Sequence, residues 1–428
     1  MLRLHASFVT LTILFSLGLS TVLHPSQRPL SFTHPPDPLN TTIHLPLFAD
    51  LEFLSRLVDI SYCVGTSGIY HPFKCLSRCD QFPTFELIDT FNTGPLLSDS
   101  CGYVAISHGG EQGMGNRNGK EWKSGDGGNG RIVVAFRGTY SLANTIADLS
   151  SVPQEYIPYP GEPGGDDEQR QSAPDSELPT ETSSTGKEKK CNNCTVHTGF
   201  WTSWENTRPY VIPRLKNLRA SYPDYRLDLV GHSLGGAVAA LAGLEVEALG
   251  WQPVVTTFGE PRVGNVGLRD YVDDVFGLLG EQGKEGTGNL GGKYRRVTHV
   301  NDPVPLLPLS EWGYRPHAGE IYISKLQLQP ELDDVRFCVG DEDTECIAGA
   351  EVDAVRDAER LRLMVRDVEG IKAEDAVSDM RWHFPARYKM WELFFSHRDY
   401  FWRLGLCVPG GDPLDWGRGP YGERKGEL

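Results

Sequence analysis

The hexapeptide Gly231-His232-Ser233-Leu234-Gly235-Gly236 constrains the fold of this chain more than any other stretch. Its first five residues fit the pattern G-x-S-x-G, in which a nucleophilic serine lies on a sharp turn between a strand and a helix. The preceding residues, Tyr225 to Val230, alternate polar and apolar side chains as a strand does, and Ala237 to Glu247 is rich in the helix formers Ala and Leu. The motif therefore falls at a strand-to-helix turn.

Ser233 is the candidate nucleophile of this turn. Glycines at positions 231 and 235 let the chain bend tightly enough to expose the serine side chain, because a Cβ at either position would clash. A helix that begins at Leu234 directs its unpaired N–H groups, and the positive end of its dipole, toward a substrate oxygen that gains negative charge. A glycine-rich turn without a catalytic role is the alternative interpretation.

The N-terminus has the composition of a secretory signal peptide. Weakly basic residues 1–5 precede an apolar run from Ala6 to about Leu19, which is short for a membrane span. We expect a signal peptide over residues 1–20 and a flexible arm or propeptide, rich in Pro and Ser, over residues 21–45. An uncleaved anchor is the alternative. No second long apolar run follows, so the mature protein is expected to be secreted, without a transmembrane segment.

The charge balance limits the classes of partner. A net charge of −16 argues against nucleic acid and anionic membrane surfaces, and suits a neutral substrate or a neutral lipid–water interface. The motifs imply no metal or organic cofactor, and we expect a monomer. Asn40 and Asn193 each begin an N-x-S/T sequence and are candidate glycosylation sites.

Nine cysteines in a secreted chain predict disulfide bridges and one unpaired thiol. Three pairs are close in the sequence: Cys75 with Cys79, Cys191 with Cys194, and Cys338 with Cys346. Spacing does not decide which two of Cys63, Cys101 and Cys407 form a fourth, long bridge. A zinc site that includes Cys191 and Cys194 is the alternative, which an oxidising compartment disfavours.

Strands and helices are expected to alternate along the chain. The apolar run Ile132–Phe136 is typical of a strand buried on both faces, and Val254–Phe258 is expected to be another buried strand. The other expected elements are strands at Thr84–Phe91, Gly102–Ser107 and Tyr294–Val300, and helices at Pro46–Tyr62 and Trp201–Ala220. This alternation predicts an α/β fold whose central sheet is mainly parallel and flanked by helices.

A catalytic serine requires a base and a carboxylate that orients the base. Asp302 is the best candidate acid, because it follows an expected strand and precedes Pro303, which biases it toward an extended conformation. A carboxylate that only caps this turn is the alternative. The histidines after Asp302 are His317, His383 and His397, and the pattern alone leaves His383 and His397 nearly equal.

Five blocks in the same order resemble the filamentous-fungal class 3 lipases: Phe136–Thr139, His197–Phe200, Gly231–Gly236, Gly259–Asn265 and Thr298–Pro305. The resemblance implies the α/β-hydrolase fold. In that family the catalytic histidine stands in a His-x-x-Tyr-Phe setting shortly before the last cysteine. The stretch His397-Arg398-Asp399-Tyr400-Phe401, with Cys407 ten residues after His397, is similar to that setting, so the resemblance implies that His397 is the base.

The resemblance also assigns an oxyanion hole and a lid. It implies that Thr139 and the N–H of Leu234 surround the developing oxyanion. Leu142, Ile146 and Leu149 form one apolar stripe at helical spacing, in the segment that is the lid in lipases of this family. A buried helix that never moves is the alternative. By the same resemblance, His232 is structural and points away from the pocket.

The family's disulfide pattern implies the bridges Cys63–Cys407, Cys75–Cys79 and Cys338–Cys346, with Cys101 as the free thiol. The pair Cys191 and Cys194 lies outside the family's usual set. The lipase-like domain is expected over residues 46–407, followed by a C-terminal tail over 408–428. Long low-complexity insertions are expected near residues 108–131, 160–190, 277–292 and 347–382.

These features together predict a secreted serine hydrolase that cleaves carboxylic esters, acylglycerols first (a triacylglycerol lipase), through an acyl-enzyme on Ser233. In this interpretation His397 deprotonates Ser233, and Asp302 stabilises the imidazolium. An esterase of feruloyl or other short-chain soluble esters, such as those of the same family, is the nearest alternative. A catalytically silent secreted binding protein on this scaffold is the alternative from another class.

Overall fold

The structure is a computed structural model that describes residues 41–94, 99–109, 130–139, 153–158, 191–279, 292–349 and 396–413. Several sequence predictions lie outside these residues: the signal peptide, Asn40, His383, the lid residues Leu142, Ile146 and Leu149, and most of the four insertions. Among the described residues, no helix combines the length and the apolar character that a membrane span requires.

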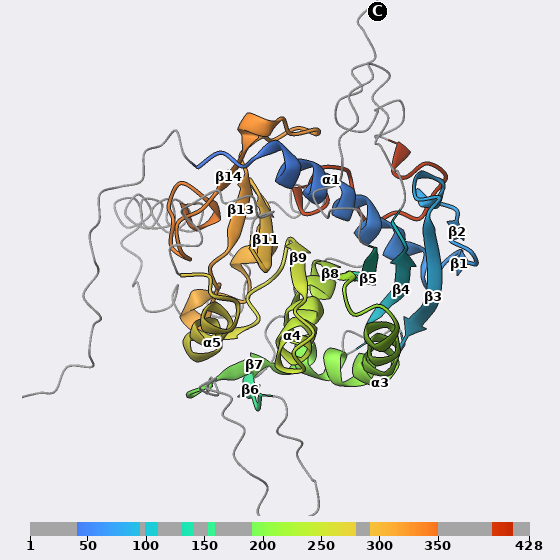
Figure 1. Cartoon of the computed structure of the whole chain (residues 1–428). Helices are drawn as coiled ribbons and strands as arrows, with labels where there is room; N and C mark the ends of the chain where they lie inside the picture. The colour runs from blue at the N-terminus through green and yellow to red at the C-terminus, as the bar shows by residue number, and fades with distance from the viewer. Residues whose placement is uncertain are drawn as a thin grey trace, which may run out of the picture. The chain divides into compact units, whose positions relative to one another are not determined.

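An eight-stranded sheet, in the order β14-β13-β11-β9-β8-β5-β4-β3, forms the centre of the described domain (Figure 1). In chain order its strands are β3 (Phe85–Asn92), β4 (Cys101–Ser107), β5 (Arg131–Phe136), β8 (Arg226–His232), β9 (Val254–Phe258), β11 (Tyr294–His299), β13 (Glu320–Ile323) and β14 (Val335–Phe337). The five strands from β13 to β5 are parallel to their neighbours, and β14, β4 and β3 are antiparallel additions at the two edges. The predicted α/β-hydrolase fold, with a mainly parallel sheet, is confirmed.

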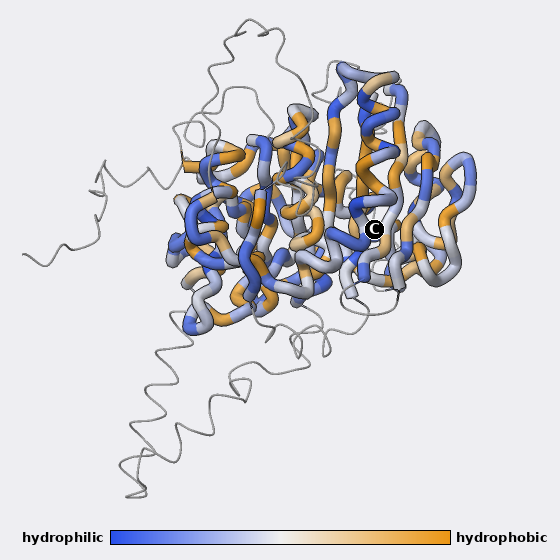
Figure 2. Tube along the Cα trace, turned by 90° about the horizontal axis from the view of Figure 1, so that it is seen from below, coloured by the Kyte–Doolittle hydropathy of each residue, from blue (hydrophilic) through white to orange (hydrophobic). Residues whose placement is uncertain are grey.

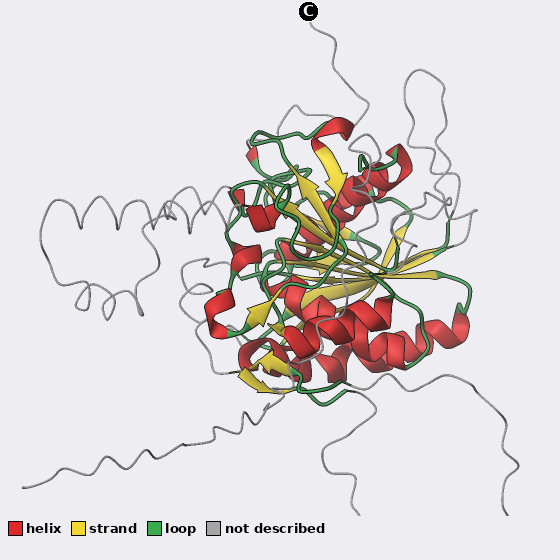
Figure 3. Ribbon diagram, turned by 90° about the vertical axis from the view of Figure 1, so that its left-hand side faces the viewer, coloured by secondary structure: helices red, strands yellow, loops and turns green. Residues whose placement is uncertain are grey.

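Helices cover both faces of the sheet (Figure 3). The helices α3 (Thr198–Ser221), α4 (Leu234–Ala248) and α5 (Val266–Phe276) pack on one face, and α1 (Leu45–Ile60) packs on the other. Side chains of β5 alternate between the two resulting cores: Val134 and Phe136 join the α3–α5 core, and Val133 and Ala135 join the α1 core. A strand that is buried on both faces is usually apolar along most of its length, which explains the continuous apolar run that predicted β5.

Shorter elements complete the domain. They are a hairpin of β1 (Ile69–Tyr70) and β2 (Lys74–Cys75), a four-stranded sheet of β6 (Pro153–Glu155), β7 (Thr195–His197), β10 (Gly264–Asn265) and β12 (Tyr314–Arg315), and 3₁₀ helices at Ser61–Cys63, Cys79–Gln81, Val304–Leu306, Ser310–Trp312 and Leu332–Asp334. Along the chain trace, apolar stretches follow the inner strands and helices, and polar stretches gather in the peripheral turns (Figure 2).

Two predicted boundaries need correction. The predicted flexible arm includes residues 41–45, but Ile43 is buried, its N–H donates to the carbonyl of Val335 over 3.4 Å, and α1 already begins at Leu45. Likewise, the tail was expected to begin at residue 408, but Asp412 is buried and accepts a hydrogen bond from Arg398 over 2.9 Å. In both places a small number of apolar or charged residues finds partners that are distant in the sequence.

The carboxyl ends of the parallel strands determine where chemistry can occur. Since parallel strands all end at one edge of the sheet, residues that follow β5, β8, β9 and β11 gather there. These residues include Thr139, Ser233, Gly259 and Asp302. Four of the five blocks that resemble the fungal lipases therefore lie at this edge.

At the opposite edge, one carboxylate on α1 joins three strand starts. Asp50 accepts hydrogen bonds from Arg131 over 2.7 Å, from Arg226 over 2.9 Å and from Arg295 over 2.6 Å. These arginines begin β5, β8 and, one residue in, β11. Burial alone would raise the pKa of Asp50, but the three guanidinium groups lower it, so the carboxylate remains ionised and ties α1 to the sheet.

Four disulfide bridges are present in the described residues: Cys63–Cys407, Cys75–Cys79, Cys191–Cys194 and Cys338–Cys346. Cys101 is a buried free cysteine. Of the three candidates for the long bridge, Cys63 and Cys407 are thus the pair. The bridge between Cys191 and Cys194 also leaves no thiolate at that pair for a zinc ion.

We predict that Cys63→Ser lowers the free energy of unfolding strongly. The bridge joins residues that are 344 positions apart, and closing a loop of that length is worth up to about 5 kcal/mol in the chain-entropy model. Cys101→Ser is the control, because Cys101 forms no disulfide in the described structure, its sulfur donates to the Asn92 side chain, and serine is close to cysteine in size. Urea unfolding of both variants is the measurement. Equal stability of the two variants would contradict a stabilising role for the long bridge.

Candidate active site

Ser233 occupies a strained turn between β8 and α4. Its φ of 57° and ψ of −128° lie in a region that non-glycine residues adopt at a cost of about 1–3 kcal/mol. Its backbone N–H donates to the carbonyl of Phe258 over 2.9 Å. A Cβ at Gly231 would lie 2.1 Å from the oxygen of Gly235, and a Cβ at Gly235 would lie 2.3 Å from the oxygen of Phe136. Both glycines are therefore required by the tight turn, as the motif predicted.

Two potential oxyanion donors lie beside this turn. A Cβ at Gly138 would lie 2.8 Å from the Cβ of Ser233, so the loop after β5 contacts the serine directly. Thr139 follows in this loop, and its buried hydroxyl has no hydrogen-bond partner among the described residues. Leu234 is the first residue of α4, so its backbone N–H is one of the donors that have no acceptor within the helix.

His397 and Asp302 form a buried pair. Nδ1 of His397 lies 3.0 Å from Oδ1 and 2.9 Å from Oδ2 of Asp302, and both side chains are almost fully buried. Burial alone would raise the pKa of Asp302, but the imidazole of His397 and the hydrogen bonds to the carboxylate lower it below its usual value. The aspartate is thus ionised and faces Nδ1, which fixes the orientation of the ring.

The other ring nitrogen of His397 is available for chemistry. Nε2 is buried and has no hydrogen-bond partner among the described residues. The ring of His232, the residue before Ser233, stacks on the His397 ring with centroids 4.8 Å apart. Ser233 and the His397–Asp302 pair therefore belong to one site.

Two residues of this site were not identified from the sequence. The hydroxyl of Tyr400 donates a hydrogen bond to Oδ2 of Asp302. Gly259 has a φ of +61°, and a Cβ there would lie 2.6 Å from the Tyr400 hydroxyl and 2.9 Å from both Oδ2 of Asp302 and Cε1 of His397. The position of a glycine directly after the buried strand β9 was the available signal, because such a glycine often permits close approach of other groups.

His232 holds the backbone of His397 in place. Its Nε2 donates to the backbone carbonyl of His397 over 2.8 Å, and its Nδ1 faces the hydroxyl of Tyr62 at 2.5 Å. Complete burial, with a smaller contribution from the neighbouring His397, lowers its pKa from 6.5 to about 3. A neutral His232 therefore holds the backbone of His397 and does not face the reacting groups.

The remaining predicted residues lie elsewhere. His317 is buried away from the pair and contacts Glu260 over 3.1 Å. Asn193 is exposed, between the two cysteines of a disulfide, and Asn40 and the lid residues lie outside the described residues. One group in the described part of the chain has the spacing of metal ligands, Glu320 with Cys338 and Cys346. Its two sulfurs form a disulfide, so it offers no thiolate ligand.

A serine on a strand-to-helix turn, with an aspartate after a later strand and a histidine after that, defines the class of α/β-hydrolases. Residues 133–312 match the family described as lipase (class 3). The chain is 52% identical over 426 residues to the secreted mono- and diacylglycerol lipase 2 of Gibberella zeae, covering 98% of this chain and 97% of that protein. It belongs to the fungal class 3 lipase family.

Two further relatives agree with this membership. The chain is 50% identical over 402 residues to lipase A of Sodiomyces alcalophilus, covering 92% of this chain and 88% of that protein. Its fold is similar to the crystal structure of Lip2 lipase from Yarrowia lipolytica, with a TM-score of 0.60 and 27% identity, over 86% of this chain and 97% of that one.

We predict that acid destabilises the fold through His232. Because its pKa is about 3 when folded and 6.5 as an ordinary value, the unfolded chain binds a proton in this window that the folded chain does not. Stability therefore falls as the pH drops from 6.5 toward 3. Between pH 6.5 and 4.5 the loss through this group should be about 2 kcal/mol.

The matched variant is His232→Gln, which can make both hydrogen bonds but does not titrate. Urea unfolding of both proteins at the two pH values gives the difference in slope. Asp59, whose raised pKa of about 6 acts in the opposite direction, is present in both proteins and cancels. An identical pH dependence in wild type and variant would refute the assignment.

Proposed function

We propose that this protein is a secreted, monomeric lipase that hydrolyses acylglycerols through an acyl-enzyme on Ser233. Membership of the class 3 lipase family makes it a carboxylic ester hydrolase. The observation that supports the catalytic assignment is the buried His397–Asp302 pair, with Nε2 of His397, which has no partner among the described residues, in the same site as the strained Ser233. The name of the Gibberella zeae relative points to mono- and diacylglycerols as substrates.

The proposed reaction has two halves. In the first, Nε2 of His397 takes the proton of the Ser233 hydroxyl, and the serine oxygen attacks the ester carbonyl. The imidazolium is stabilised by ionised Asp302, and it then protonates the alcohol as the carbon–oxygen bond breaks. In the second half, His397 deprotonates a water molecule, which attacks the acyl-serine and releases the fatty acid.

The oxyanion of each tetrahedral intermediate is assigned to three donors. They are the backbone N–H of Leu234 and the backbone N–H and hydroxyl of Thr139. The hydroxyl supports this role because it is buried and unpartnered among the described residues, in the loop that contacts Ser233. One such donor typically contributes about 3 kcal/mol to transition-state stabilisation.

The proposal also includes secretion and action at a lipid–water interface. Residues 1–20 have the composition of a signal peptide, and the Gibberella zeae relative is named as secreted. The family resemblance assigns the lid to Leu142, Ile146 and Leu149, which lie outside the described residues.

We predict that Ser233→Ala, Asp302→Ala and His397→Ala each lower kcat on a diacylglycerol by roughly 10⁴-fold or more. Because the three side chains act as one unit, the triple variant should be little worse than the worst single variant. His383→Ala is the matched control and should remain active. If His383→Ala lost activity while His397→Ala remained active, His383 and not His397 would be the base.

A substrate panel tests the substrate class separately. It compares mono-, di- and triacylglycerols with a phospholipid and methyl ferulate at equal enzyme concentration. The proposal expects the highest kcat/KM on an acylglycerol. A preference for methyl ferulate would contradict it and assign the protein to the soluble-ester esterases.

A further inference from the structure

The described residues that follow His397 form no continuous helix or strand. From His397 to Asp412 the backbone shows turns, bends and an isolated bridge between Asp399 and Arg403, and Ser396 at the start of this segment is helical. The position of His397 therefore depends on how this segment is fastened to the rest of the domain.

A closed turn follows His397. The N–H of Leu404 donates to the carbonyl of Arg398 over 2.9 Å, and the Arg398 side chain donates back to the carbonyl of Leu404. Gly405 comes next with a φ of +104°, and a Cβ there would lie 3.2 Å from Nε of Arg398. Residues 398–405 thus form one closed turn. A contact that fixes Gly405 therefore also fixes Arg398, the residue that follows His397.

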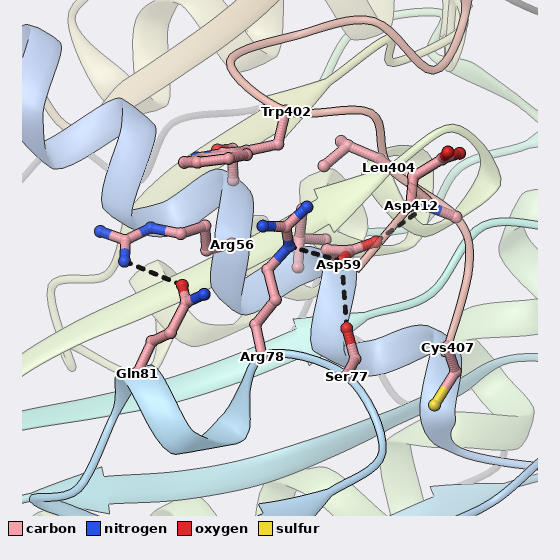
Figure 4. Close-up of polar contacts among 12 residues, drawn as sticks. Arg56, Asp59, Ser77, Arg78, Gln81, Trp402, Leu404, Cys407 and Asp412 are labelled. Atoms are coloured by element: carbon pink, nitrogen blue, oxygen red, sulfur yellow. Dashed lines mark hydrogen bonds and ion pairs between the residues drawn. The ribbon is translucent and has the colours of Figure 1, made fainter. Parts of the chain in front are cut away.

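A buried carboxylate on α1 holds Gly405. Asp59 is 0% exposed, and its Oδ1 accepts the N–H of Gly405 over 2.9 Å. Its Oδ2 faces Nε of Arg78 at 3.3 Å and the hydroxyl of Ser77 at 3.4 Å (Figure 4). The bond from Gly405 joins residues 346 positions apart, so it connects the first helix to the C-terminal segment.

Arg78 contacts the same segment on its other sides. Its guanidinium lies 4.4 Å from the ring centroid of Trp402, and a Cβ at Gly411 would lie 2.2 Å from its Nη2. In Figure 4, Arg78 lies between Asp59 and Trp402. One cation therefore bridges the α1 carboxylate and two positions of the C-terminal segment.

We propose that Asp59, aligned by Arg78, is a positioning residue for His397. It fixes the Gly405 end of the 398–405 turn, and so the backbone of His397, which His232 holds by a separate hydrogen bond. This inference rests on the proposed role of His397 as the base.

The raised pKa of Asp59 favours a role in positioning His397 over a role in stabilising the fold. Burial raises the pKa of Asp59 from 3.8 to about 6, even though Arg78, the N–H of Gly405 and the more distant Arg398 act to lower it. A carboxylate that is harder to ionise in the folded state than in water gives little net stability. Its directional hydrogen bond to Gly405 is what an apolar residue of the same size could not provide.

The test compares Asp59→Ala with Asp50→Ala. Both residues are buried carboxylates on α1 that bind arginine, but Asp50 lies at the sheet edge opposite to the site. Assayed well below both melting temperatures, Asp59→Ala should lower kcat about tenfold or more with KM within about twofold, because small displacements of a catalytic group are costly. Asp50→Ala should keep kcat within about threefold despite a lower melting temperature.

Asp59→Asn supplies the conservative rescue. Its amide oxygen can still accept the N–H of Gly405 without the negative charge, so kcat should recover most of the loss. Unchanged kcat in Asp59→Ala would overturn the proposal. An equal loss of kcat in Asp50→Ala would also overturn it, because the loss would then follow stability alone.

Gly405→Ala keeps the inference testable if Asp59→Ala does not fold. An alanine at a φ of +104° is strained and crowds Arg398, so it displaces the N–H that Asp59 accepts. Its kcat should fall tenfold or more, and an unchanged kcat would refute the proposal. An inactive wild-type protein would instead refute the proposed function, so the two failures are distinguishable.

Discussion

The hydrogen bond from Nδ1 of His397 to the carboxylate of Asp302 joins two segments 95 residues apart, and the rest of the site is arranged around it. A buried, ionised carboxylate is tolerated because both of its oxygens accept hydrogen bonds. Oδ1 of Asp302 also accepts the N–H of Val304, and Oδ2 also accepts the Tyr400 hydroxyl. This crowding explains the glycine at 259, since any Cβ would contact three members of the group. The sheet supplies the geometry by ending its parallel strands at one edge.

Local patterns in the sequence were sufficient for most of the fold. Glycines spaced around Ser233 predicted the strained turn, because only a tight bend requires both. The continuous apolar run Ile132–Phe136 predicted β5, because strands buried on both faces are rich in apolar side chains. For Asp302, its place after a strand and before Pro303 was informative. The choice between His383 and His397 required the family resemblance, and the structure places His397 beside Asp302.

What the sequence could not provide are contacts between distant residues. The pairing of Asp59 with Gly405, across 346 positions, has no local signal, and neither has the packing of residues 41–44 against β14. Helix α5 was missed although its ends are marked, by the Asn265 side chain that accepts the N–H of Leu268 and by Gly277 with a φ of 67°. These signals are weak individually, and an apolar stripe usually decides whether they mark a helix.

The central claim is that Ser233 forms the covalent acyl-enzyme. The most direct measurement is the reaction of the secreted protein with an organophosphate ester, followed by intact-mass and peptide mass spectrometry. The account predicts one phosphoryl adduct per molecule, on the peptide that contains Ser233, in parallel with loss of lipase activity. It also predicts much slower labelling in His397→Ala. Activity lost with the adduct on another residue, or activity retained after Ser233 is fully labelled, would contradict the account.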